Sequence, residues 1–147
     1  MKQPTLVLAL LLTAACNRND RIAQNAATPP LNVTSETPGD WSELRLLTGR
    51  TPADSGLFQD SPITVDLNAL LGAEATTYRR AIEGGSMLAP VGPVLITVAA
   101  DRSAYLVIFP DDHALEAGLK TPRGWRRWNT PGSNVPRPAA IAQLLAS

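Results

Sequence analysis

The sequence predicts an α+β domain in which short N-terminal helices pack on one face of an antiparallel meander of three or four strands, and a C-terminal helix closes the fold. Apolar residues recur at helical spacing over 40–83, dense runs of Val, Ile, Leu and Tyr follow over 91–109, and helical spacing returns at 138–146. Helices followed by consecutive strands are typical of the α+β class. Residues 40–147 are enough for one hydrophobic core without a metal or a disulfide.

The helical part contains signals for three short helices. The segment 40–43, Asp-Trp-Ser-Glu, has the form of a capping box, and the helix it begins is expected to stop at Gly49. Ser61 is placed as the N-cap and Pro62 as the first residue of a second helix. A third helix is predicted for about 73–83, before two consecutive glycines.

The strand-forming part begins with a predicted β-hairpin. Its strands are residues 91–100 and 104–109, and Asp101-Arg102-Ser103 forms the tip between them. A weaker strand near 115–119 and a fourth over 124–129 continue the meander.

The first 15 residues have the pattern of a secretory signal. Lys2 is followed by an apolar run over 6–12 and by small residues before Cys16, which is the order of a cleaved signal peptide. The run is much shorter than the roughly 18 residues that a membrane-spanning helix needs. Residues 1–15 are therefore predicted to be a signal peptide.

The residues at the end of this leader, Leu12-Thr13-Ala14-Ala15-Cys16, resemble the lipobox of bacterial lipoproteins. The resemblance implies a diacylglyceryl group on Cys16 and cleavage just before it. In lipoproteins of bacteria with two membranes, Asp directly after the cysteine favours retention in the inner membrane. This position is Asn17 here, so the resemblance implies the periplasmic face of the outer membrane. An ordinary cleaved signal, with Cys16 as a free thiol near the new terminus, is the alternative.

Residues 16–39 are expected to be a disordered tether carrying the lipidated cysteine, because they are rich in Asn, Ala, Thr and Pro and lack apolar periodicity. Such a segment reaches about 25–30 Å on average.

The formal net charge is zero, which argues against nucleic acid as a partner. The charges are nevertheless separated: residues 51–78 contain four acids and no Lys or Arg, whereas 117–147 contain five bases and no acid. Two interpretations stay open. The two groups neutralise each other or are solvated, or the bases form a patch for an anionic partner.

Two segments contain residue types that could serve in catalysis. Residues 85–90, Gly-Ser-Met-Leu-Ala-Pro, are similar to the box around the nucleophilic serine of type I signal peptidases, but the proline is one position late and that family's Arg-Gly-Asp box is missing. His113, the sole histidine, follows Asp111 and Asp112 in a predicted turn. A hydrolase using Ser86 or His113 is an alternative, and the leading interpretation is a protein that is not an enzyme and needs no cofactor or metal.

The most unusual binding candidate is Trp125-Arg126-Arg127-Trp128. On a strand, Trp125 and Arg127 face one side and Arg126 and Trp128 the other. One Trp is expected to pack into the core, and the other to stack with Arg and contact sugar, peptide or lipid headgroups.

A second resemblance concerns the domain itself. From Leu44 onward the order of features is similar to that of periplasmic lysozyme inhibitors of the vertebrate-lysozyme (Ivy) type. The similar segments are Leu67-Asn68-Ala69-Leu70-Leu71-Gly72, Tyr78, Gly92-Pro93-Val94-Leu95 and Ser103-Ala104-Tyr105-Leu106-Val107-Ile108. The resemblance implies an inhibitory loop between the two hairpin strands, but Asp101, Arg102 and Ser103 stand there without that family's Cys-flanked Pro-His loop.

The sequence therefore predicts a lipid-anchored periplasmic lipoprotein with a non-catalytic binding domain. Its expected partners are the membrane, through the acyl chains on Cys16, and a cell-wall or envelope protein component. An inhibitor of a lysozyme-like cell-wall hydrolase is the alternative function in the same compartment.

Overall fold

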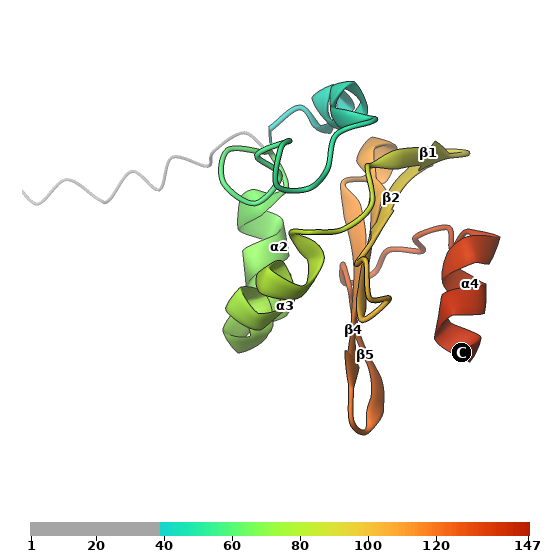
Figure 1. The fold of residues 1–147 in the computed structure, drawn as a ribbon. Coiled ribbons are helices and arrows are strands. Elements are labelled where there is room, and N and C mark those ends of the chain that lie inside the picture. Colours follow the sequence, from blue (N-terminus) through green and yellow to red (C-terminus); the bar gives the residue numbers. More distant parts are fainter. Residues whose placement is uncertain (1–38) are drawn as a thin grey trace, which may run out of the picture. The chain divides into compact units, whose positions relative to one another are not determined.

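The computed structural model describes residues 39–147, so the predicted signal peptide, Cys16, Asn17 and most of the predicted tether lie outside the described residues. The domain is α+β and contains a five-stranded antiparallel sheet in the order β1-β2-β3-β4-β5 (Figure 1). The strands are β1 Ala89–Val91, β2 Val94–Val98, β3 Ala104–Phe109, β4 Ala114–Thr121 and β5 Gly124–Asn129. The helices are η1 Trp41–Leu47, α2 Thr64–Leu71, η2 Gly72–Glu74, α3 Ala75–Ile82, η3 Pro110–Asp112 and α4 Ala139–Ala146.

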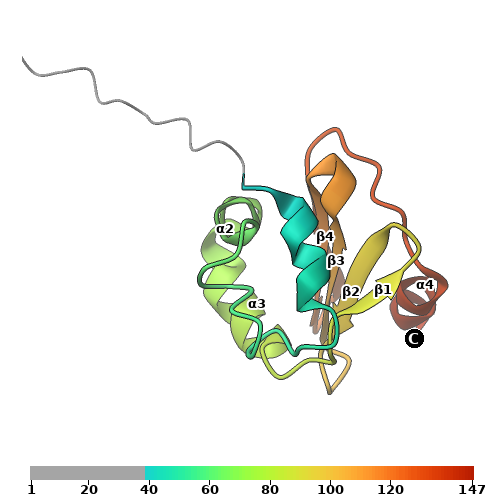
Figure 2. The same cartoon turned by 90° about the horizontal axis from the view of Figure 1, so that it is seen from above.

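The N-terminal helices η1, α2 and α3 cover one face of the sheet, as predicted (Figure 2). Their apolar sides bury Trp41, Leu67 and Tyr78 against the residues of β3 and β4 that face them. Trp41 and Tyr78 are completely buried, and aromatic side chains of this size contribute much of the apolar area of a small core.

Helix α4 covers the opposite face, whereas the sequence predicted helices on one face only (Figure 2). Ile141 and Leu144 of α4 pack with Val94, Tyr105 and Val107 in a second apolar cluster. The physical reason is visible in the strands: β3 is buried at five consecutive positions, so both of its faces need a cover. The domain thus has three layers, and both clusters consist of residues between 41 and 144.

Two details of the prediction, the number of strands and the N-cap of α2, were wrong, and the first helix was confirmed with a more specific type. The sheet has five strands because Ala89–Val91 pairs with β2, an edge strand hidden in the sequence by its shortness and by Pro90. The first helix is a 3-10 helix, although Asp40 does cap it by accepting a hydrogen bond from the Ser42 amide at 2.9 Å. Ser61 does not cap α2: its hydroxyl lies in the preceding turn, where it donates to the Leu57 carbonyl at 2.8 Å.

Two tyrosines connect the layers. The Tyr78 hydroxyl on α3 donates to the Tyr105 carbonyl at 2.6 Å, and the Tyr105 hydroxyl donates to Glu116 Oε1 at 2.5 Å on the other side of the sheet. The Tyr105 ring lies over Gly118, its partner in β4, where an added Cβ would overlap the ring. Gly118 therefore provides the space that the Tyr105 ring occupies.

Among the helices of residues 39–147, none is both long enough and apolar enough to cross a membrane.

Candidate functional site

The β4–β5 hairpin and the β2–β3 turn lie at the same end of the sheet, because alternate turns of an antiparallel meander share an end. Ala104, the first residue of β3, pairs with Leu119, so the last part of β4 continues past its neighbour. The Lys120 amide still donates to the Ser103 carbonyl at 2.7 Å. Beyond that point the hairpin projects from the domain by itself (Figure 1).

Five exposed cationic side chains gather here, and we call them the basic end. They are Arg102 of the β2–β3 turn and Lys120, Arg123, Arg126 and Arg127 of the hairpin. Within residues 39–147, Arg126 alone of the five forms an ion pair, from its Nη1 to Glu74 Oε1 at 2.7 Å. The sequence predicted either neutralisation or a basic patch, and the structure contains one such neutralising pair beside four cations without one.

One acid of the β2–β3 turn lies among these cations. The Asp101 carboxylate accepts a hydrogen bond from the Ser103 amide at 2.9 Å, and its hydrogen bonds with Ser103 lower the pKa of Asp101. Arg102 has a φ of 60° in this tight turn. Asp101, Arg102 and Ser103 thus form a compact turn between β2 and β3, with Asp101 and Arg102 exposed.

The Trp and Arg residues of β5 alternate between the two faces as predicted from strand geometry. Trp125 packs with the α4 layer, with its ring 5.6 Å from that of Tyr105, and Trp128 packs on the other layer, with its ring edge-on to Tyr78 at 6.4 Å. Both rings are partly buried, and each packs against a different apolar cluster, so the structure places a Trp on each face of the sheet. A cation covers each ring: Lys120 Nζ lies 5.9 Å from Trp125, and the Arg126 guanidinium 5.2 Å from Trp128.

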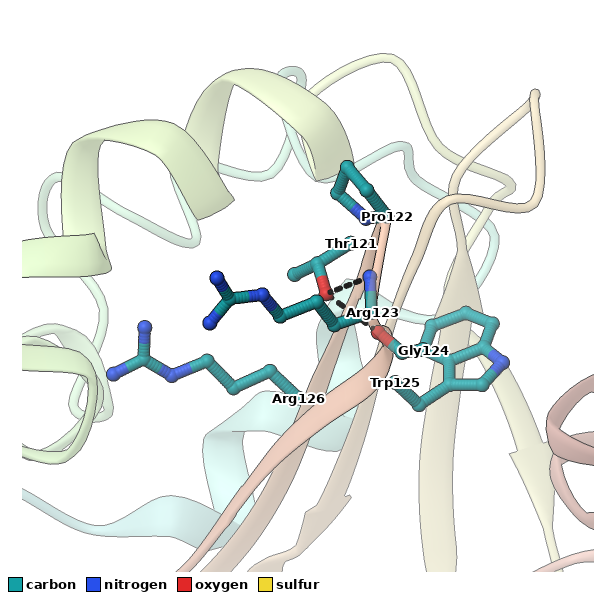
Figure 3. Close-up of a pocket in the computed structure, with 6 residues that line it drawn as sticks. All are labelled: Thr121, Pro122, Arg123, Gly124, Trp125 and Arg126. Atoms are coloured by element: carbon teal, nitrogen blue, oxygen red, sulfur yellow. Dashed lines mark hydrogen bonds between the residues drawn. The ribbon is translucent and has the colours of Figure 1, made fainter.

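A shallow depression of about 520 Å³ marks the tip of the hairpin, lined by residues 121–126. Figure 3 shows the side chains of Arg123 and Arg126 extending side by side from one face, while Trp125 points to the other. The Thr121 hydroxyl donates to the Gly124 carbonyl at 2.8 Å and accepts from the Arg123 amide at 3.3 Å, which fixes the turn. Two adjacent guanidinium groups offer several N–H donors, and these match the oxygens of carboxylate or phosphate groups.

Ser86 and His113, the two candidates for hydrolysis, do not lie close to each other. The Ser86 hydroxyl accepts a hydrogen bond from the Val98 amide at 3.1 Å, so it extends the sheet hydrogen bonding at the turn end of β2. His113 lies in the β3–β4 turn at the opposite end, with its ring 5.2 Å from that of Trp41. Four residue steps along β3 separate these ends, which is roughly 13 Å. Ser86 and His113 therefore cannot exchange a proton directly.

Glu116, Tyr105 and Arg137 form a buried polar cluster that the sequence did not predict. Glu116 is 1% exposed and accepts hydrogen bonds from Tyr105 and from Arg137, whose Nη2 lies 2.9 Å from Glu116 Oε1 and 3.0 Å from Oε2. The bond to Glu116 raises the pKa of Arg137. Its signal in the sequence is the single acid within the apolar strand 114–119. The cluster attaches the segment before α4 to the sheet, and we assign it a structural role.

In the part of the chain that the structure describes, no group of three His, Cys, Asp or Glu side chains is placed to hold a metal ion. The fold and the site together define a three-layer α+β domain with a cationic hairpin. Comparisons with protein-family models, with curated proteins and with solved structures found no match for the chain.

Proposed function

We propose that this protein is a lipoprotein, held by acyl chains on Cys16 at the periplasmic face of the outer membrane, whose domain is a non-catalytic binding module. The basic end is its binding surface, and the partner is an anionic component of the cell envelope. The observation that carries the proposal is the gathering of Arg102, Lys120, Arg123 and Arg127 at one end of the sheet without ion-pair partners among residues 39–147. Like charges brought together in this way repel one another unless an anion binds, so the arrangement favours an anionic partner.

The lipid anchor is tested by replacing Cys16 with Ser. Without the thiol no diacylglyceryl group can be attached, and several acyl chains supply the firm membrane binding that a single chain does not. We expect the native protein in the outer-membrane fraction and the Cys16→Ser protein outside the membrane fractions. Equal recovery of the two proteins with the membranes would refute the anchor.

The binding surface is tested with the chain from residue 17 on immobilised polyglutamate, a simple carboxylate polymer. We expect retention that falls with added salt, because salt screens exposed charges over about 10 Å at 0.1 M. Arg102→Glu with Arg123→Glu should weaken binding about tenfold, since two exposed ion pairs of up to about 1 kcal/mol each are lost.

The matched control is Arg50→Glu with Arg80→Glu, which changes the net charge equally at two exposed arginines of the segment after η1 and of α3. This control should bind within about twofold of the native chain, a difference below 0.5 kcal/mol. If the two double variants lose the same affinity, net charge alone controls binding, and the assignment of the basic end fails.

A further inference from the structure

The basic end lies opposite the point where the chain enters the domain. Trp41, in the first turn of η1, contacts His113 beside η3, and Arg45 of η1 pairs with Asp111 at 3.0 Å. Because η3 joins β3 to β4, it lies at the other end of the sheet from the β2–β3 turn and the β4–β5 hairpin. Figure 1 shows η1 and the tip of the hairpin at opposite extremes of the domain.

This placement separates the binding surface from the anchor. If Cys16 holds the chain at a membrane, the anchored chain reaches the domain at residue 39, on the end distal to the cations. The cations thus lie at the end of the domain farther from the point where the chain enters it.

The basic end also lacks the apolar side chains that a surface for lipid would use. Proteins that bind at the membrane interface combine cations with large apolar residues that enter the acyl boundary. The large apolar side chains exposed among residues 39–147 are Leu46, Val65, Met87 and Val91, and none belongs to the hairpin or to the β2–β3 turn. Trp125 and Trp128 are partly buried, and each packs against one of the two apolar clusters.

The ion pair at this end indicates which anion the arginines accept. Arg126 holds the Glu74 carboxylate at 2.7 Å, and the Arg123 side chain lies beside it at the same depression without an acidic partner among the described residues (Figure 3). The side chains of this pair are 56% and 34% exposed, so the bond is accessible to exchange with an external carboxylate.

We infer that the basic end binds peptidoglycan, the hydrated cell-wall polymer whose peptide stems carry free carboxylates, with Arg123 and Arg126 as the central carboxylate contacts. The inference rests on the proposed function and specifies its partner. The tether holds the domain at the membrane while the hairpin contacts the wall, so the protein connects the two. A wide, water-filled network needs no apolar insertion, which agrees with the exposed arginines at the tip of the hairpin.

The test is cosedimentation of the chain from residue 17 with purified sacculi, in parallel with vesicles that contain phosphatidylglycerol. We expect sedimentation with sacculi and weaker binding to the vesicles. Arg102→Glu with Arg123→Glu should lower binding to sacculi about tenfold, and Arg50→Glu with Arg80→Glu should leave it within about twofold. Circular dichroism verifies that each variant is folded.

Amidation of the sacculus carboxyl groups separates recognition of carboxylates from recognition of the glycan. Binding should disappear on amidated sacculi. Retention on polyglutamate without sedimentation with sacculi would overturn this inference and leave the proposed function standing. Stronger binding to vesicles than to sacculi would overturn it as well, because the partner would then be a membrane and not the cell wall. Unchanged binding after amidation would exclude carboxylates as the ligand.

Discussion

At the level of single residues, the candidate site could be predicted only in part from the sequence. The alternation of Trp125, Arg126, Arg127 and Trp128 follows from strand geometry and required no structure. The packing of both Trp rings against apolar clusters was not predictable, because the cluster beside Trp125 depends on α4 lying on the second face of the sheet. The contribution of Arg102 was equally hidden, since it joins Arg123 only through the register of β3 with β4.

Glu74 is the residue that we expect to limit binding at the basic end. Its carboxylate occupies Arg126, so an external carboxylate has to compete with it. Glu74→Gln removes the competing charge, and because an exposed pair is worth up to about 1 kcal/mol, binding to polyglutamate should become up to about fivefold tighter.

The control for Glu74 is Asp60→Asn, which removes one exposed acid without an ion pair among the described residues. It should change binding less than Glu74→Gln does. Weaker binding after Glu74→Gln would mean that Glu74 positions Arg126 for the ligand, which would contradict its assignment as a competitor.

At the level of elements, the sequence predicted the N-terminal helix layer and the strands β2 to β5 from apolar patterning. The predicted strand 124–129 coincides with β5, and the predicted helix 138–146 differs from α4 by one residue. The second layer was missed although β2 and β3 lack the alternation of a strand with one solvated face. Continuous apolar runs of this kind indicate cover on both faces, and the only helix left to supply it is at the C-terminus.

The projecting hairpin depends on a different kind of information. Its turn residues, Pro122 and Gly124, mark a reversal in the sequence, and Gly124 adopts a φ of 109° that other residues rarely tolerate. How far it extends past β3 follows from pairing between segments distant in the sequence. Local patterns therefore predict the hairpin but not its exposure.

At the level of the whole molecule, the two tyrosines of the chain link the layers, and both side chains are completely buried. Tyr78 belongs to the layer of η1, α2 and α3, and Tyr105 to the layer of α4, with the sheet between them. Neither hydroxyl can reach water without opening of a layer. Their ionisation consequently reports on the integrity of the fold as a whole.

Burial raises the pKa of Tyr78 well above its usual 10.0, and burial together with the Glu116 carboxylate raises that of Tyr105. Above pH 10 the unfolded chain therefore loses tyrosine protons that the folded chain keeps. Below pH 10 these two groups leave the free energy of unfolding independent of pH. Above pH 10 they lower the free energy of unfolding by up to about 1.4 kcal/mol per pH unit for each tyrosine. We expect tyrosinate absorbance to stay absent through pH 10 and to appear together with the loss of the circular dichroism of the fold.

In Tyr78→Phe, the absorbance of the remaining Tyr105 should also appear together with the loss of circular dichroism, because the burial of Tyr105 depends on the α4 layer. Tyrosinate absorbance that rises near pH 10 while the dichroism is still native would show that one layer opens without the other, and the two cores would then be independent rather than joined through Tyr78 and Tyr105.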